Sequence, residues 1–395
     1  MASGTDAAMR RDDRLKIIVG SVFVTSPFSP GIAWDWLHLI FGLQALGHEV
    51  LFVEEVPSHM SRDADGRPCP PEHSVNRRHF RAAMERFGLL DRACQLHEGT
   101  AFTEGLSRDA LHAAVRGTDL LINVSGHVKS DFILEAADRR VYFDQDPVFT
   151  QLWLSEYGVE LNLRPEDTLL TVGLNIGTPH TEIPDCGLRW HHCLPAVALE
   201  HWPVAAGSNG RPFTTVASFG SYSELQFRGE WYRSKREAFR DMAELAKRTD
   251  QQLEVALKAP PDDADAVLLR EQGWRLVDPG RIDSLASYQN YIAASSAEIG
   301  IAKDAYVRSN SGWFSDRAAH YLASGKPVLA QSTGFERCLP TGRGLLTFRD
   351  VDEAAAGIAE INGDYAGHCR AARELAEEFL DARKVMAPVV ELAMA

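Results

Sequence analysis

Residues 309–329 read SNSGWFSDRAAHYLASGKPVL, and they predict a loop, a capped helix and a buried strand in direct succession. Ser315 is a suitable N-cap, because its hydroxyl can accept a hydrogen bond from a backbone N–H of the first turn. Every fourth position is apolar and forms one face of a helix, at Phe314, Ala318 and Leu322. Gly325 is expected to end the helix before the strand begins.

The opposite face of this predicted helix carries Asp316, Arg317 and His320. A glycine-bearing loop that leads into a helix N-terminus offers unpaired N–H groups and a partial positive charge, which suit a phosphate. Arg317 opposes the helix dipole, so a bound anion would help to explain it. The alternative is a solvated arginine that pairs with Asp316 or another neighbour, and the spacing by itself favours neither.

Strand and helix patterns alternate along the whole chain around this stretch. Residues 15–55 predict a strand, a loop with proline and glycine, a helix and a second strand. Such a βαβ unit crosses over with a right hand onto a parallel sheet. Further apolar runs follow at 119–125, 139–146 and 167–177, with a short helix expected between the first two. Residues 178–211 are rich in Pro, His, Trp and Gly, and AAGSNGRP at 205–212 is the best candidate for a linker.

The alternation begins afresh after this linker. Strands are expected at 212–220, 253–258, 274–278, 297–303 and 344–348, and helices at 232–248, 264–273 and 288–296, with a largely helical tail. The sequence therefore predicts an α/β protein with two doubly wound, Rossmann-like domains at 1–204 and 205–395. Their strand ends should face an interdomain cleft, and the last helices are candidates to pack back on the N-terminal domain.

The composition favours a soluble, cytoplasmic protein. Its 395 residues are 45% hydrophobic and 24% charged, and the net charge of −14 argues against a general nucleic-acid binder. No apolar run is long enough to cross a bilayer, and the charged start MASGTDAAMRRDDR does not resemble a secretory signal. The six cysteines form no CxxC pair, and the cluster at 186–193 has a spacing unlike that of a structural zinc site.

Polar side chains of the first half follow predicted strand ends. His127 follows the strand at 119–125, and Asp146 ends the next one. Asp35 and His38 lie three residues apart on the first helix and so share a face. A histidine near a carboxylate is a suitable general base, because the carboxylate orients the ring and stabilises its charged form. His127 is the preferred base, although an ordinary surface or capping role is the alternative for each residue.

Cations and small residues follow the strands of the second half. Gly220 and Ser221 come after the first of these strands, where a small residue allows close approach of the backbone. Lys258 and Lys303 come at two other strand ends, and Lys303 immediately precedes the loop that leads to Arg317. A diphosphate would meet these cations and the helix N-terminus together. Nothing in the sequence requires a metal or another cofactor, since the helix dipole and the cations can stabilise a departing diphosphate.

Several common nucleotide-site and nucleophile motifs are absent from the sequence. It contains no GxxxxGK[ST] loop, no GxGxxG after the first strand and no GxSxG elbow. These absences weigh against an ATPase, a standard nicotinamide dehydrogenase and a serine hydrolase of that type.

The turn ASGKPV at 323–328 resembles the nucleotide-sugar domain of GT-B glycosyltransferases, which have a small residue, Gly, any residue, Pro and Val after a loop and helix. Residues 333–358, TGFERCLPTGRGLLTFRDVDEAAAGI, are similar to the part that follows in that group, and LQALGHEVLFVE at 43–54 is similar to its first unit. The resemblance is sharpest from Gly312 to Ile358, in a divergent bacterial branch with the pattern WFSDRxxxYLASGxPV.

The resemblance implies transfer of a sugar from a nucleotide donor to an acceptor held by the N-terminal half. Gly220, Ser221, Lys258 and Lys303 would then face the donor, while residues 315–317 would neutralise the leaving diphosphate and His320 would assist. His127 with Asp146, or Asp35 with His38, would take the acceptor's proton. Retaining members carry two glutamates where this chain has Gly312 and His320, so their mechanism is not carried over.

Two other functions remain open for a chain of this pattern. One is a nucleotide-sugar 2-epimerase, which would need carboxylates around the sugar in both halves. The other is a non-catalytic nucleotide-sugar-binding protein of the same fold. The expected partners are a nucleotide sugar and a small-molecule acceptor, without nucleic acid, and a homodimer is an open alternative to a monomer.

Overall fold

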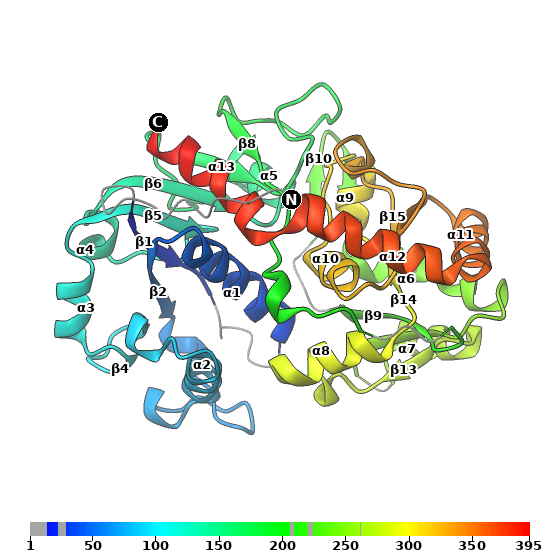
Figure 1. Ribbon diagram of the computed structural model, residues 1–395, viewed down its shortest axis with the longest axis horizontal. Coiled ribbons are helices and arrows are strands. Elements are labelled where there is room, and N and C mark those ends of the chain that lie inside the picture. The colour runs from blue at the N-terminus through cyan, green and yellow to red at the C-terminus, as the bar shows by residue number, and fades with distance from the viewer. Residues whose placement is uncertain (1–13, 23–28, 206–208, 220–223, 261) are drawn as a thin grey trace, which may run out of the picture.

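The computed structural model describes residues 14–22, 29–205, 209–219, 224–260 and 262–395. Within them the chain forms two open, twisted sheets that lie side by side and are flanked by helices (Figure 1). Each sheet has the strand order of a doubly wound fold. The strand that comes first along the chain lies inside its sheet, with the second strand on one side. On its other side lies the fifth strand in the first sheet and the fourth strand in the second sheet, when strands are counted within each sheet. The expectation of two doubly wound α/β units is therefore confirmed.

The first sheet has eight strands in the order β4-β3-β2-β1-β5-β6-β7-β8. All of its neighbours pair in parallel except β3 and β4, which are antiparallel. The strand at 16–20 lies inside this sheet, and its apolar residues Ile17, Ile18 and Val19 are fully buried. A continuous apolar run of this kind is typical of a strand that is covered on both faces. The strands are β1 Lys16–Gly20, β2 Glu49–Val56, β3 Ala93–His97, β4 Thr103–Gly105, β5 Thr118–Val124, β6 Ala137–Asp144, β7 Thr168–Thr171 and β8 Trp190–His192.

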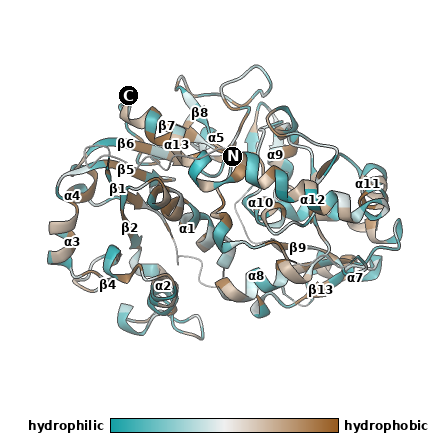
Figure 2. Cartoon of the chain, in the orientation of Figure 1, coloured by the Kyte–Doolittle hydropathy of each residue, from teal (hydrophilic) through white to brown (hydrophobic). Residues whose placement is uncertain are grey.

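The most deeply buried helix of this half is α1 (Pro30–Ala45). Proline at its first position suits a helix start, because that N–H would have no partner in any case. Hydrophobic residues gather on α1 and on the strands beside it (Figure 2). The other helices of this half are α2 Val75–Arg86, α3 Arg108–Ala114, α4 Asp131–Leu134 and α5 Phe149–Ser155.

The second sheet has six parallel strands in the order β13-β12-β9-β14-β15-β16. Its strands are β9 Phe213–Ser218, β12 Leu253–Lys258, β13 Arg275–Val277, β14 Ala297–Gly300, β15 Val328–Gln331 and β16 Leu345–Phe348. A separate hairpin pairs β10 Leu225–Phe227 with β11 Glu230–Tyr232. The helices are α6 Lys235–Asp241, α7 Ala264–Gln272, α8 Leu285–Ala294, α9 Asp304–Arg308, α10 Asp316–Ala323, α11 Val351–Gly363, α12 Tyr365–Leu375 and α13 Ala382–Met394.

The structure differs from the sequence prediction at several places. The prediction named no element between residues 56 and 118, where α2, β3, β4 and α3 lie, and it expected a loop where α9 follows Lys303. The helix expected at 232–248 is broken at Met242 into α6 and a 3-10 turn at Ala243–Lys247. The region expected to be irregular at 178–211 contains β8, which extends the first sheet by a strand. The hairpin of β10 and β11 was not predicted. Strands of three residues are too short to show a periodic pattern, so only tertiary pairing reveals them.

The last helix returns to the first half of the molecule. After a π-helical turn at Ala376–Leu380, α13 packs along α1 (Figure 1). The Val197 N–H donates to Leu380 O at 2.7 Å, and the Ala382 N–H donates to Val197 O at 2.9 Å. The approach is close, because a Cβ on Gly42 of α1 would lie 2.7 Å from Ala382 O. Among the described residues, no helix has the length and apolar character that crossing a membrane requires.

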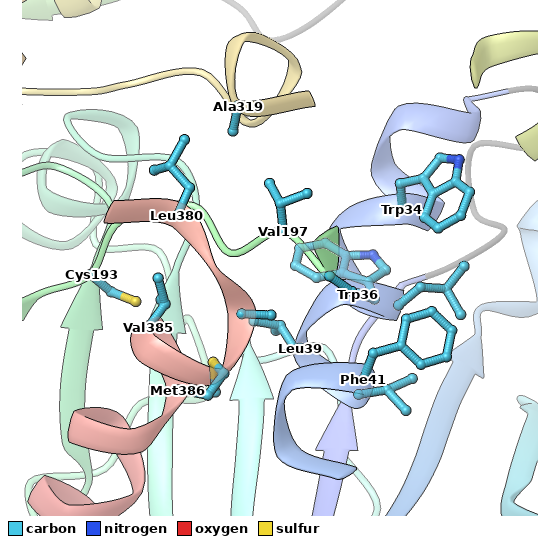
Figure 3. Close-up of a cluster of buried hydrophobic side chains, with 14 of the residues drawn as sticks. Trp34, Trp36, Leu39, Phe41, Cys193, Val197, Ala319, Leu380, Val385 and Met386 are labelled. Atoms are coloured by element: carbon cyan, nitrogen blue, oxygen red, sulfur yellow. The ribbon is translucent and has the colours of Figure 1, made fainter. Parts of the chain in front are cut away.

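One buried hydrophobic cluster extends across both halves. It joins Trp34, Trp36 and Leu39 of α1 to Val385 and Met386 of α13 and continues to residues of α10 (Figure 3). Such a continuous core should couple the two sheets mechanically, because separating them would expose apolar surface to water. The predicted boundary at 204/205 lies between the last strand of one sheet and the first of the other, and it stays a prediction.

Candidate active site

A cleft of about 770 Å³ lies between the two sheets, at the carboxyl ends of their strands. Both switch points in strand order face it, which is where ligands bind in such folds. From the first sheet, Ser125 and His127 follow β5, and Asp146 follows β6. From the second sheet, Lys258 ends β12 and Lys303 follows β14. The topology thus brings together residues that the sequence spreads over almost 180 positions.

The N-terminal end of α10 forms part of the cleft wall, as Ser315, Asp316 and Arg317 line it. The apolar face predicted from the spacing packs inward, and Phe314, Ala318 and Leu322 are at most 2% exposed. Gly325 ends the helix with φ +67°, and the Lys326 N–H donates to Tyr321 O at 2.9 Å in a Schellman motif. The predicted loop, helix and strand are therefore confirmed.

The Ser315 hydroxyl does not cap α10 as expected. Ser315 holds the N-cap position, but its side chain accepts no hydrogen bond from the first turn. Its Oγ instead lies 3.4 Å from Asp316 Oδ1 as a donor. The first-turn N–H groups of α10 are thus not used by this hydroxyl, and the only acidic side chain in the first turn is Asp316.

Arg317 has a buried partner that the sequence did not reveal. Its Nε donates to Glu298 Oε1 at 2.5 Å, and its Nη1 donates to Val216 O at 2.8 Å. Burial opposes its charge, but the Glu298 carboxylate raises the pKa of the guanidinium above its usual value. The alternative prediction that Arg317 is solvated is therefore wrong, because its side chain is only 12% exposed. A cation in the first turn of α10 is explained by Glu298 even without a bound anion.

Two lysines bring their amines into the cleft beside Arg317. Lys235, in the first turn of α6, lines the cleft, and burial followed by repulsion from Arg317 and Lys303 lowers its pKa well below the ordinary value. Lys303 Nζ lies 3.5 Å from Asp146 Oδ1, and burial lowers its pKa despite that carboxylate. Lys258 is exposed at the rim. An anion placed among these amines would relieve the repulsion between them.

The site residues predicted from the sequence do not include Lys235, although its position at the start of a helix would have indicated it. Ser234 is the N-cap of α6 and accepts from the Arg236 N–H, so Lys235 stands at the first helical position. A cation there opposes the helix dipole in the same way as Arg317 does in α10. The same criterion applied to residues 234–236 would have found it.

His127 and Asp146 lie on the side of the cleft formed by the first sheet. Burial lowers the pKa of His127 to about 4, with the Asp146 carboxylate acting in the opposite direction, so the ring is neutral and can accept a proton near pH 7. Asp146 Oδ1 accepts from Tyr306 Oη at 3.3 Å and lies near Lys303. Its backbone N–H donates to buried Asp144 at 2.9 Å, which holds the loop after β6 in place.

Asp35 lines the cleft, but His38 and His320 lie behind it. Burial, followed by the charge of the Asp316 carboxylate on α10, raises the pKa of Asp35 on α1 well above its usual value. The rings of His38 and His320 are almost fully buried, and their Nε2 atoms are 3.1 Å apart. His320 also stacks on Trp202 with the ring centroids 4.5 Å apart. These two histidines join α1 to α10 and do not line the cleft.

The remaining predictions concern Gly220, Ser221 and metals, and the structure also shows why Gly312 differs from the glutamate of retaining members. Gly220 and Ser221 lie outside the described residues, and Ser218 just before them lines the cleft. At Gly312, φ is +76° and a Cβ would lie 2.7 Å from the Asn175 nitrogen, so no glutamate fits there without a backbone shift. Within the described part of the chain, no three His, Cys, Asp or Glu side chains gather in a way that could hold a metal ion.

No model of a known protein family matches the sequence, and no curated protein matches it. Solved structures do resemble it over nearly the whole chain. HepE from Anabaena in complex with UDP and glucose has a TM-score of 0.57 at 13% identity, and the match covers 96% of this chain and 99% of HepE. AviGT4, a glycosyltransferase involved in avilamycin A biosynthesis, has a TM-score of 0.52 at 14% identity, with 96% and 97% covered.

An alpha-glucosyltransferase in complex with UDP-glucose and DNA containing an abasic site has a TM-score of 0.57 at 11% identity. That match covers 97% of this chain and 99% of the alpha-glucosyltransferase. At these identities the likeness establishes the architecture of the chain. The protein has the GT-B fold of glycosyltransferases, as the resemblance of residues 312–358 implies.

Proposed function

We propose that this protein transfers a sugar from a nucleoside-diphosphate sugar to a small-molecule acceptor. The observation that carries the proposal is the meeting of Lys235, Lys303, Arg317 and the N-terminal end of α10 in one cleft. A diphosphate leaving group develops negative charge as its bond to the sugar breaks, and fixed positive groups stabilise that charge. This arrangement supports a reaction in which the lysine amines and the backbone N–H groups of α10 stabilise the departing diphosphate.

The donor is proposed to bind on the side of the cleft formed by the second sheet. Its phosphates would lie against α10 and Lys235, with Lys258 at the rim toward the nucleoside. A uridine nucleotide is the first donor to test, because HepE was solved with UDP and the alpha-glucosyltransferase with UDP-glucose. A divalent metal is not required in this scheme, since the lysines and the helix end can neutralise the diphosphate.

The acceptor is proposed to bind on the side formed by the first sheet. That wall is largely apolar and includes Val22, Ile32, Trp36, Leu39 and Phe143. Among the described lining residues from 22 to 196, none is lysine or arginine. A polyanionic acceptor needs clustered cations, so this wall favours a small, partly apolar molecule over nucleic acid.

His127 is proposed to accept the proton of the acceptor hydroxyl. It lines the acceptor side of the cleft and is neutral near pH 7. The acceptor oxygen would bond to the anomeric carbon, the bond from that carbon to the diphosphate would break, and the hydroxyl proton would pass to His127. With all six cysteines outside disulfides, the protein is proposed to act in a reducing compartment such as the cytoplasm.

Incubation with a panel of nucleotide sugars tests this function against its two alternatives. Nucleotide release that depends on an added acceptor supports transfer. Conversion of the donor sugar without an acceptor supports the 2-epimerase, and saturable donor binding without turnover supports a non-catalytic protein. An absence of both binding and turnover across the panel would contradict the proposal.

A further inference from the structure

The turn between β6 and α5 is strained and carries a residue of the cleft. Val148 has φ +73° and ψ −54°, which is a strained region for a β-branched residue. Its side chain is fully buried, so the contacts around it must hold this conformation. Two residues earlier, Asp146 lines the cleft, where its Oδ1 accepts from Tyr306 Oη at 3.3 Å and lies 3.5 Å from Lys303 Nζ. The shape of this turn therefore sets where the Asp146 carboxylate lies.

The Asp144 carboxylate accepts four hydrogen bonds, three of them from residues of this turn and of α5. Asp144 is fully buried at the end of β6. Its Oδ1 accepts from the Asp146 backbone N–H at 2.9 Å and from Thr150 Oγ1 at 2.6 Å. Its Oδ2 accepts from Gln151 Nε2 at 3.1 Å and from Thr171 Oγ1 at 2.8 Å. Each oxygen thus meets one group that can only donate, a backbone N–H at Oδ1 and an amide nitrogen at Oδ2.

The strained residue itself fixes the orientation of the Gln151 amide. Gln151 Oε1 accepts from the Val148 backbone N–H at 2.7 Å, and that N–H can only donate. The Nε2 end must therefore face Asp144, and position 144 must present an acceptor to it. Because the other oxygen of Asp144 accepts from the Asp146 N–H, only a carboxylate satisfies both sides. An amide at position 144 would leave two donors facing each other on one side.

We propose that Asp144 is a positioning residue: its buried carboxylate holds the strained turn at Val148 and so fixes the Asp146 carboxylate in the cleft. Gln151 connects the two, because its amide bonds to Asp144 at one end and to Val148 at the other. Asp144 itself is buried behind the cleft and does not line it. Its effect on turnover rests on the proposed function, in which Asp146 lies on the acceptor side with His127. A turn held in this way has its final shape before any substrate binds.

Exchanging the donor and the acceptor between positions 144 and 151 tests the proposal. Asp144→Asn sets two amide nitrogens against each other, and Gln151→Glu sets two carboxylates against each other. The double variant should restore a matched pair, because the new amide nitrogen can donate to the new carboxylate, which still accepts from the Val148 N–H. Its net charge equals that of the wild type. The control is Asp138→Asn, an exposed change on the same strand.

Backbone hydrogen exchange of the full chain reports on the turn without any substrate. In each single variant the Asp146 and Val148 N–H groups should exchange at least about tenfold faster than in the wild type. In the double variant and the control, the exchange rates should stay within about threefold of the wild type. Wild-type exchange in the single variants, or a double variant that exchanges as fast as they do, would overturn the proposal. If one single variant fails to fold, the other decides.

Turnover with the active donor and acceptor separates positioning from catalysis. Each single variant should lose about 10- to 100-fold in kcat, because a small misplacement of a group in the site is costly, and the double variant should recover to within about threefold of the wild type. UDP affinity, measured by calorimetry, should stay within about threefold throughout, because the donor is proposed to bind on the other side of the cleft.

A double variant with wild-type exchange but the low kcat of Asp144→Asn would make the Asp144 charge itself necessary and would overturn the proposal. Absence of turnover in the wild type with every nucleotide sugar would contradict the proposed function alone. The exchange rates would then still decide whether Asp144 holds the turn.

Discussion

At the scale of single residues, His127 is the group whose chemistry is most directly testable. His127→Ala should reduce kcat by about 10² to 10⁴, the usual contribution of a general base, while leaving UDP affinity unchanged. The wild-type rate should fall as pH approaches the His127 pKa of about 4, because a protonated ring cannot accept a proton. Steady-state kinetics with calorimetric UDP binding check this, and the exposed His180→Ala is the control. Normal turnover in His127→Ala would make this histidine structural.

Lys235 offers a second residue-scale prediction. Removing its charge in Lys235→Met should weaken UDP binding by about 10- to 100-fold, since a hydrogen bond between charged groups is lost. In the wild type the bound diphosphate should raise the lowered pKa of Lys235, so binding should take up protons at pH values between the pKa of the free protein and that of the complex. Calorimetry in buffers of different ionisation enthalpy measures this uptake.

A matched control for Lys235 is the exposed Lys247→Met, which should leave UDP binding as it is. Equal affinity of Lys235→Met and the wild type would remove Lys235 from the donor site. Retained proton uptake in Lys235→Met would assign the titrating group elsewhere, with Lys303 as the next candidate.

The sequence predicted which side chains line the cleft where their position at the end of a strand or helix was enough to place them. Asp146, Lys258 and Lys303 line the cleft as predicted, because the carboxyl ends of parallel strands share one edge of a sheet, and their roles stay predictions. Partners across the fold were not predictable in this way. The bond from Arg317 to Glu298 and the pair of His38 with His320 join distant segments, and a single sequence contains no distances.

At the scale of elements, the end of α10 depends on one left-handed residue. Gly325→Ala should destabilise the protein by about 1–2 kcal/mol, because an L-residue is strained at its φ of +67°. A Cβ there would also lie 2.9 Å from Val204 Cγ1. Urea unfolding measures the loss. The control is Gly363→Ala at the end of α11, where a Cβ meets open space and the stability should be unchanged or higher.

Helices and strands with longer sequence patterns were predicted more accurately than short ones. α1, α10 and the strands beside them were predictable, because apolar spacing and Pro or Gly boundaries agreed over ten or more residues. The break of the helix at Met242 and the three-residue strand β8 depend on packing against other segments. No local preference in the sequence identifies them. An unchanged urea midpoint of the Gly325→Ala variant would show that the C-terminal end of α10 also depends on packing more than on Gly325.

At the scale of the whole molecule, α13 should hold the two halves together. Met386→Ala removes a fully buried side chain from the cluster between α13 and α1 and should cost about 2–5 kcal/mol. Because that cluster continues into the second half, circular dichroism and tryptophan fluorescence should follow one shared unfolding transition. The partly buried Met394→Ala is the control and should cost much less. Two separate transitions in the wild type would contradict a shared core.

The overall architecture was the most predictable level, because alternating strands and helices leave few ways to build a parallel sheet. The packing between the halves was not predictable. The resemblance at residues 312–358 indicated the fold, yet it did not predict that His320 would be buried and stacked on Trp202. Function in this chain must therefore be argued from its own cleft.

The central claim is that the lysines and the N-terminal end of α10 bind the diphosphate of a nucleotide sugar. A crystal structure of the protein with UDP tests it most directly. The terminal phosphate should lie within about 2.7–3.2 Å of first-turn N–H groups of α10 and of Lys235 or Lys303. Phosphates bound outside the cleft, or turned away from α10 and these lysines, would contradict the claim.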